Sequence, residues 1–278
     1  MKAEHLYRLA GAALLALAPA PPALGAAPVR VVSINPCVDA ILMHVADPSQ
    51  IAGISHYSSD PRASSITPAQ AARFVATSGT AEEVVALAPD LVIASPHVAP
   101  STVAALRRMG VRLLQPGVPA SVAESQRQIM EIAGAVGHAD RGERLNARID
   151  AALRGARTAG PAVPALIWQG GGLVPGENTL ASELLRTAGF HNLSRDYGLK
   201  DWDVLPLEHL VARPPAVLFS VGALRGEDRM LGHPAVKRLA RDMAVHRFPE
   251  RLLQCAGLTI IDAMTTLAAA RRQLARQR

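Results

Sequence analysis

The sequence predicts an α/β protein built from two Rossmann-like lobes joined by a long rigid helix. Short apolar or β-branched segments alternate with helical segments along most of the 278 residues, which favours parallel sheets covered by helices. One pattern, an acidic residue followed by a short apolar helix, a proline turn and a buried strand, occurs at 82–94 and again at 208–220. We therefore expect an N-terminal lobe at 27–138, a connecting helix at 139–159 and a C-terminal lobe at 160–278.

The composition limits the possible classes of protein. Hydrophobic residues make up 49% and charged residues 19% of the chain, so it can bury a core and is not disordered. Two cysteines exclude a disulfide-rich scaffold and a four-cysteine zinc module. The net charge is +6, but the arginines are dispersed and aromatic residues amount to 3%. The sequence therefore does not predict a nucleic-acid-binding protein.

The N-terminus has the features of a secretory signal peptide at 1–26. Lys2 and Arg8 precede an apolar stretch at 9–18, and prolines and small residues follow it. That stretch is too short to span a bilayer, and the small residues at 23–26 offer a cleavage site. The alternative is a short buried helix. No cysteine follows closely, so we expect no lipid anchor and a soluble, exported mature protein.

In the N-terminal lobe, strands are predicted where β-branched or apolar runs end at turn residues, and helices where apolar residues recur every three or four positions. The strands are expected at 30–34, 51–55, 75–77, 91–94 and 111–114, and the helices at 37–46, 69–74, 80–87, 101–109 and 122–136. Thr80 and Glu83 form a predicted capping box. Gly110 is suited to end the preceding helix.

The connecting helix is predicted from the apolar stripe of Leu145, Ile149 and Leu153, and it ends at the sequence 159–161, Ala-Gly-Pro, a typical boundary. In the C-terminal lobe the same criteria place strands at 165–168 and 216–221, and helices at 179–188, 234–240 and 258–272.

Catalytic signatures are missing from the sequence. It contains no nucleophile elbow, P-loop, zinc-protease motif or dinucleotide fingerprint. The nine histidines are scattered without ligand spacing. A hydrolase that used a cysteine and a histidine would lack a third supporting group. We therefore expect a protein that is not an enzyme and that holds no intrinsic cofactor.

Several segments resemble the class III (helical-backbone) periplasmic binding proteins of ABC importers, in the vitamin B12 and iron-siderophore branch. They are Arg30–Pro36, Ile51–Pro61, Gly79–Ile93, Asn178–Leu185 and Trp202–Ala212. The resemblance extends from Val29 to the C-terminus. It implies a monomeric periplasmic protein with a ligand cleft between its lobes. Its partner would be a dimeric membrane permease with its ATPase.

The resemblance also gives roles to two acidic residues. Glu82 and Glu208 match the surface glutamates, one in each lobe, that dock on arginines of the permease. Two exposed carboxylates at fixed points would give charge complementarity to a basic partner. The alternative is that each glutamate only stabilises its helix N-terminus.

The ligand implied is a metal-containing chelate, with a corrinoid expected first and a ferric siderophore or haem as the alternative. Tyr57 and Trp202 match ligand-facing aromatic residues of the B12-binding relatives, although Trp202 could instead be a plug under a loop. His97 follows Ser-Pro where those relatives have a tryptophan, and Arg251 stands near their acidic residues. A periplasmic sensor without a transport role is a further alternative. Arginines that would suit an anionic chelate are Arg225, Arg229 and Arg251.

Cys37 and Cys255 are placed by the resemblance on opposite lobes, both facing the cleft. Three interpretations are open. The cysteines could form an interlobe disulfide, provided that their Cα atoms come within about 7 Å. They could be soft ligands for a metal, together with His56 or His97. They could also be small core residues.

Overall fold

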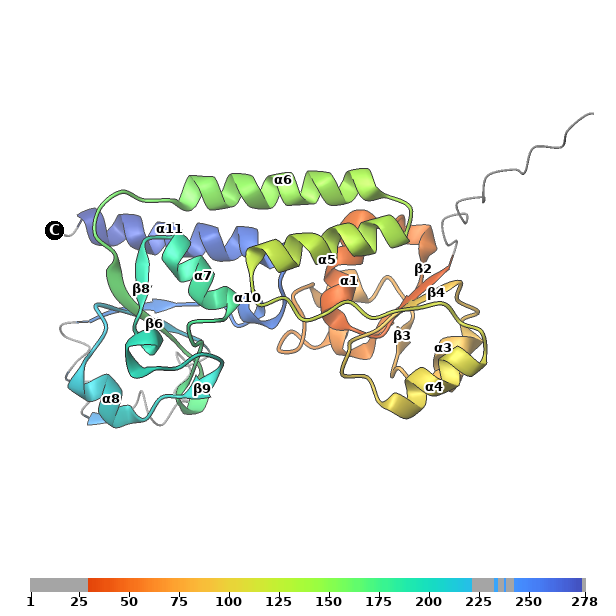
Figure 1. Cartoon of the computed structure of the whole chain (residues 1–278), viewed down its shortest axis with the longest axis horizontal. Helices are drawn as coiled ribbons and strands as arrows, with labels where there is room; N and C mark the ends of the chain where they lie inside the picture. Colours follow the sequence, from red (N-terminus) through yellow and green to blue (C-terminus); the bar gives the residue numbers. More distant parts are fainter. Residues whose placement is uncertain (1–29, 222–232, 235–237, 239–242, 277–278) are drawn as a thin grey trace, which may run out of the picture.

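The computed structural model describes residues 30–221, 233–234, 238 and 243–276. Two α/β lobes lie side by side beneath a long helix, which gives the molecule an elongated shape (Figure 1). The predicted two-lobe α/β fold is confirmed. The expected signal peptide at 1–26, Arg225, Arg229 and most of the helix expected at 234–240 lie outside the described residues.

The N-terminal lobe contains a parallel sheet in the order β3-β2-β1-β4-β5. Its strands are β1 (Val31–Ser33), β2 (Ile51–Ser55), β3 (Ala76–Thr77), β4 (Leu91–Ile93) and β5 (Leu113–Leu114). Its helices are α1 (Pro36–Val45), α2 (Pro68–Ala71), α3 (Ala81–Ala86), α4 (Pro100–Arg108) and α5 (Val122–Ala135), with short 3₁₀ turns η1 (Pro48–Gln50) and η2 (His56–Ser59). The strand order reverses beside β1, and ligands of such sheets bind beyond the carboxyl ends of the strands at this point.

The C-terminal lobe repeats this plan with a parallel sheet in the order β11-β10-β6-β8 and a small antiparallel pair, β7 with β9. The strands are β6 (Val163–Trp168), β7 (Leu173–Val174), β8 (Phe190–Asn192), β9 (Asp203–Val204), β10 (Val217–Ser220) and β11 (Ala244–Arg247). The other elements are η3 (Gly170–Gly172), α7 (Leu180–Thr187), η4 (Leu193–Tyr197), α8 (Leu207–Ala212), α10 (Arg251–Gln254) and α11 (Thr259–Arg276).

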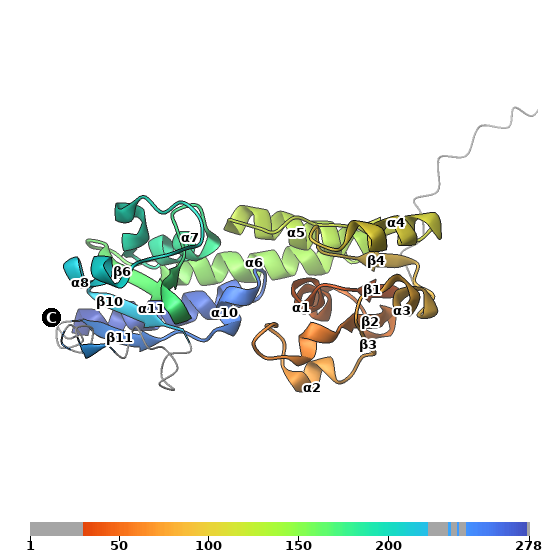
Figure 2. The same cartoon turned by 90° about the horizontal axis from the view of Figure 1, so that it is seen from below.

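Helix α6 (Ala139–Ala156) is 18 residues long and runs across both lobes (Figures 1 and 2). It packs on α1 and α5 of the N-terminal lobe and on α11 of the C-terminal lobe. The buried stripe of α6 includes Leu145 and Ile149, as its apolar periodicity predicts.

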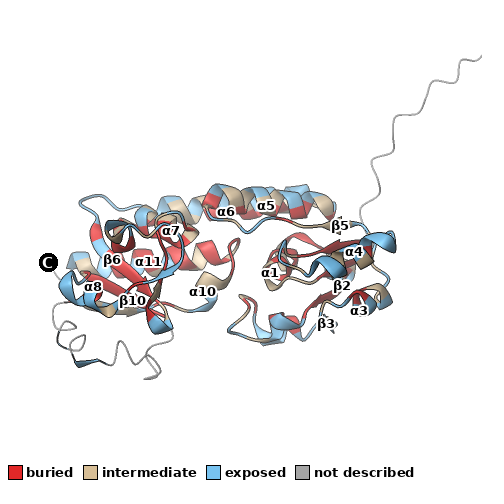
Figure 3. Ribbon diagram, turned by 60° about the horizontal axis from the view of Figure 1, so that its bottom comes forward, coloured by how far each residue is buried: buried red, intermediate tan, exposed pale blue. Residues whose placement is uncertain are grey.

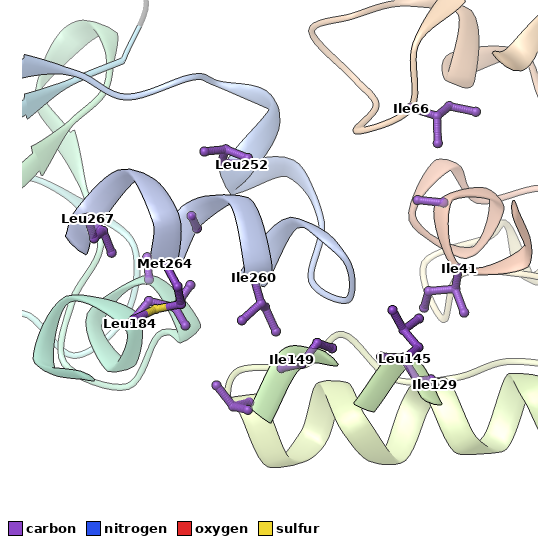
Figure 4. Packing of buried hydrophobic residues seen from close by; sticks show 14 of the residues in the cluster. Ile41, Ile66, Ile129, Leu145, Ile149, Leu184, Leu252, Ile260, Met264 and Leu267 are labelled. Carbon is purple, nitrogen blue, oxygen red and sulfur yellow. The ribbon is translucent and has the colours of Figure 1, made fainter. Parts of the chain in front are cut away.

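The hydrophobic core is continuous from one lobe to the other. Buried residues follow the sheets of both lobes (Figure 3). A single cluster of buried side chains includes Ile41 of α1, Ile129 of α5, Ile149 of α6 and Ile260 of α11, and Figure 4 shows these four side chains near the place where the helices of the two lobes meet. The lobes therefore share a core at the helical side of the molecule.

The predicted capping box at the start of α3 is half right. The Thr80 side chain accepts a hydrogen bond from the Glu83 backbone N–H, as expected. The Glu83 carboxylate, however, accepts from the backbone N–H and hydroxyl of Ser78 and from the Thr77 hydroxyl. These donors lower the pKa of Glu83 and tie α3 to the end of β3.

Within residues 30–221 and 243–276, no helix combines the length and apolar character needed to cross a bilayer.

Candidate functional site

A pocket of about 290 Å³ lies between the lobes. Asn35, two residues beyond the end of β1, and Cys37 contribute to it from the N-terminal lobe, as does the segment 117–120 ahead of α5. The C-terminal lobe contributes the segments 178–181 and 252–256. The pocket therefore lies where the topology of a parallel sheet predicts a ligand site.

Backbone hydrogen bonds fix the wall that carries Trp202. The Gly176 N–H donates to the Asp201 carbonyl at 2.9 Å, and the Asn178 N–H donates to the Lys200 carbonyl at 2.7 Å. The backbones approach so closely that a Cβ built on Gly176 would lie 2.3 Å from the Asp201 carbonyl oxygen. Only glycine fits there, and the contact holds Asp201 and Trp202 beside the pocket.

The opposite wall, the segment 117–120, is held to α5. The Gln128 side chain donates to the Gly117 carbonyl at 2.7 Å, and the Glu124 carboxylate accepts from the Ala120 N–H at 2.8 Å. This leaves Val118 in the pocket lining with 66% of its surface exposed. An exposed apolar side chain at this place offers contact area to a ligand.

A disulfide between Cys37 of the N-terminal lobe and Cys255 of the C-terminal lobe joins the two lobes at the pocket, and the Cα atoms are 5.2 Å apart. Of the three interpretations of these cysteines, the structure has the interlobe disulfide. The interpretation of the cysteines as soft metal ligands is wrong, because the two sulfurs are bonded to each other. Both residues still line the pocket.

The described lining of the pocket is apolar and rich in carboxamides. Its carboxamide side chains are Asn35, Gln128, Asn178 and Gln254. Asp201 is the only ionisable side chain among the described lining residues. Such a surface offers both donors and acceptors of hydrogen bonds but little charge.

Three residues that were expected to contact ligand are not among the described lining residues. Tyr57 lies on η2 with 55% of its surface exposed and its ring centroid 4.0 Å from that of His56. His97 is exposed in the turn after β4. Arg251 forms a 3.0 Å ion pair with Asp262 of α11. Their roles as ligand contacts remain predictions.

The expected metal set of Cys37, Cys255 and His56 or His97 is not assembled. The His56 Nδ1 atom lies 3.2 Å from the Thr77 carbonyl oxygen. In the described residues, no group of three His, Cys, Asp or Glu side chains forms a metal-binding cluster.

Asp39 was missed by the sequence analysis, although its place in the first turn of α1 could have indicated it. Its side chain is fully buried and accepts hydrogen bonds from the Ser55 N–H at 3.0 Å and the Ser58 hydroxyl at 2.6 Å. Burial raises the pKa of Asp39 to about 7. The residue thus anchors η2, which carries Tyr57, to α1, which carries Cys37.

Glu82 and Glu208 occupy equivalent places in the two lobes. Each is the second residue of a short helix, α3 or α8, that leads into the strand beside the first strand of its lobe. Both are exposed, and neither forms an ion pair within the described part of the chain. Helices α3 and α8 lie on the side of the molecule away from α6 (Figure 1).

Two Rossmann-like lobes, a helical spine and a pocket between the lobes define a class III periplasmic binding protein. The model of the family described as "Periplasmic binding protein" matches residues 31–240, so the chain belongs to this family. No curated protein sequence matches the chain.

Solved structures share the fold over nearly their whole length. The periplasmic haem-binding protein RhuT from Roseiflexus sp. RS-1 is 24% identical, with a TM-score of 0.69 over 87% of this chain and 98% of its own. The haem-binding protein HutB of Vibrio cholerae is 17% identical, with a TM-score of 0.70 over 87% and 98%. The vitamin B12-binding protein BtuF of Vibrio cholerae is 16% identical, with a TM-score of 0.69 over 90% and 99%.

Proposed function

We propose that this protein binds a corrinoid in the cleft between its lobes and delivers it to the permease of an ABC importer in the periplasm. The observation that carries this choice is the described lining of the pocket, which is rich in carboxamides and has one ionisable side chain, Asp201. A corrin ring carries carboxamides around its rim, and its cobalt arrives with its equatorial ligands in place. Side chains such as Asn178 and Gln254 can pair with those amides, so neither partner is buried without hydrogen bonds.

Trp202 supports the same ligand class. Trp202 is one of the lining residues and is 39% exposed, so its ring can pack against a flat macrocycle. A large aromatic surface buried in this way contributes both area and stacking energy. Val118 would add apolar contact from the other lobe.

Haem is the second candidate, and a specific observation favours it. His56 and Tyr57 expose adjacent rings on η2, and an imidazole or a phenolate can bind haem iron. Asp201 weighs against haem and anionic siderophores, because a carboxylate in the pocket repels the negative charge of propionates or catecholates. Of the arginines expected to suit anionic chelates, Arg251 is the one among the described residues, and it forms an ion pair with Asp262.

Titration calorimetry of the mature protein with cyanocobalamin, haemin and a ferric tris-catecholate tests the proposal. We expect cyanocobalamin to bind with a Kd of about 1 μM or below, and Trp202→Ala to weaken binding at least about tenfold. Met109→Ala removes an exposed apolar side chain outside the described lining, and it is the control that should leave the Kd unchanged. Haemin binding without cyanocobalamin binding would assign the protein to haem.

Removing the charge of Asp201 gives a second test that distinguishes a neutral corrinoid from an anionic chelate. Asp201→Asn should leave the affinity for a neutral corrinoid nearly unchanged, because carboxamides replace one hydrogen-bond acceptor with another. The same change should raise the affinity for an anionic chelate by removing like-charge repulsion.

A transport role and a sensor role are distinguished by substitutions at the two glutamates expected to dock on the permease. If Glu82→Ala and Glu208→Ala together abolish uptake but leave ligand affinity unchanged, the protein has a transport role.

A further inference from the structure

One wall of the pocket depends on a very short helix. Residues 252–256 line the pocket consecutively, and they belong to α10 and to the link between α10 and α11. Helix α10 is four residues long, and the Glu250 side chain does not cap it. A single turn of helix has little stability of its own, so contacts outside the turn must hold this wall in place.

Some of those contacts come from α11 of the same lobe, on which α10 packs, and others reach across to the N-terminal lobe. The disulfide joins Cys255 to Cys37 at the start of α1. Two residues further on, the buried Gly257 N–H donates to the buried Ser125 hydroxyl of α5 at 2.9 Å. Gly257 also lies beside α1, because a Cβ added to it would be in ordinary van der Waals contact with the Cγ1 atom of Ile41, at 3.4 Å. Of these three contacts with the N-terminal lobe, the disulfide is the covalent one, and its two cysteines line the pocket.

We propose that the Cys37–Cys255 disulfide is a covalent clamp that presets the ligand cleft, and that its reduction loosens the wall at 251–257 and weakens ligand binding. The part that concerns ligand rests on the proposed function. A site held in its binding geometry before the ligand arrives loses less conformational entropy on binding, and this raises affinity.

Reduction of the Cys37–Cys255 disulfide requires a dithiol as reductant. Its thiolate attacks one cysteine sulfur, the S–S bond breaks, and a mixed disulfide forms. The second thiol of the reductant then displaces the remaining cysteine. Two electrons pass to the protein, Cys37 and Cys255 end as thiols with one proton each, and the reductant leaves as a disulfide.

Because the disulfide lies in the pocket lining, ligand binding and reduction of the disulfide should affect each other. Cys255 is 7% exposed and Cys37 is half-buried, and both contribute to the pocket lining. A dithiol that approaches through the pocket competes with ligand for the same space. Because coupling between two binding events is mutual, a ligand that binds the oxidised protein more tightly also resists its reduction.

Hydrogen exchange measured by mass spectrometry tests the clamp without any ligand. The oxidised wild type is compared with the double variant Cys37→Ser/Cys255→Ser and with wild type that has been reduced by dithiothreitol and alkylated. We expect amide exchange at 251–257 to be at least about tenfold faster without the disulfide. Phe190→Leu changes a buried ring of the C-terminal core outside the described pocket lining. It is the control for a general loss of stability, and its amide exchange rate at 251–257 should be close to that of the oxidised wild type.

Ligand measurements complete the test. For whichever of cyanocobalamin and haemin binds the wild type, the Kd should rise about tenfold in the double variant, and bound ligand should slow reduction by dithiothreitol. Unchanged exchange at 251–257 in both disulfide-free proteins would overturn the clamp even if ligand binds. If neither probe binds the wild type, the proposed ligand class is wrong, and the exchange result alone decides the clamp.

Discussion

The Asp39 carboxylate accepts a 2.6 Å hydrogen bond from the Ser58 hydroxyl, and both groups are buried. The second carboxylate oxygen of Asp39, Oδ1, is buried without a hydrogen-bond partner. An ionised carboxylate in this place is poorly solvated, and so burial raises its pKa to about 7. This hydrogen bond links α1 to the turn that carries Tyr57. Because Asp39 changes its protonation near pH 7, we expect the link to depend on pH.

Asp39 gives the first prediction, which concerns pH. Its pKa is higher in the folded protein than in the unfolded chain, so folding takes up a proton between these two values. The stabilisation from Asp39 is present in full below about pH 4 and is lost as the pH rises through about 7.

We expect Asp39→Asn to remove this component, because the amide keeps an acceptor for Ser58 and has no charge to bury. Between pH 5 and pH 8 the free energy of unfolding of the wild type should fall by roughly 2 kcal/mol more than that of the variant. Urea unfolding at both pH values measures the difference. Equal pH dependence in the two proteins would contradict the assignment.

Gly142 gives the second prediction, on the packing of α6 against α5. A Cβ at Gly142 would lie 2.7 Å from the Ala133 Cβ and 3.1 Å from the Met130 sulfur. Gly142→Ala should therefore lower the free energy of unfolding by about 1–3 kcal/mol through overpacking. Gly134→Ala is the matched control, since nothing lies within 4 Å of its added methyl, and it should raise stability by up to about 1 kcal/mol. Stabilisation by both changes would show that the helices can separate to accept the methyl.

The third prediction concerns docking. Glu82→Ala together with Glu208→Ala should lower the ATP hydrolysis that the binding protein stimulates in a reconstituted permease by at least about tenfold. Ligand affinity should stay unchanged, because neither glutamate is in the described lining of the pocket. Glu143→Ala removes an exposed carboxylate from α6, the helix that lies away from α3 and α8, and should have no effect. Full stimulation by the double variant would refute the docking assignment.

The fourth prediction concerns the stability that the disulfide provides. The cysteines are 218 positions apart, so the bond closes a very long loop in the unfolded chain. The chain-entropy relation gives about 5 kcal/mol for such a loop. Urea unfolding with and without dithiothreitol should reveal a decrease of this order, and a change below about 1 kcal/mol would argue against it.

Much of the fold could be predicted from local sequence patterns. Helix α6 shows a clear apolar stripe, and β1, β2 and β4 are compact apolar runs. Four strands of the C-terminal lobe were missed for physical reasons. Strands β7 and β9 are two residues long, too short to show a pattern. Strand β8 is three residues long and follows a helix closely, so it shows no periodicity. Strand β11 alternates half-buried and exposed residues and is recognisable mainly by its pairing with β10.

The site was less predictable than the fold. Cys37, Trp202 and Cys255 line the pocket, whereas Tyr57, His97 and Arg251 are not among its described lining residues. Asp201 and Val118 were missed because both lie in loops. Their approach to the pocket depends on how the two lobes pack together through α5, α6 and α11, and this packing leaves no local signature in the sequence.

The separation of the two cysteines also bears on how the protein matures. The sequence has two cysteines, so only one intramolecular pairing exists and scrambled isomers of a single chain cannot form. Cys37 is synthesised 218 positions ahead of Cys255, so its thiol has no intramolecular partner until Cys255 has been synthesised. During that interval Cys37 can form a disulfide only with another molecule, such as a second nascent copy, and the bond across the pocket can form only after segments of both lobes have been made.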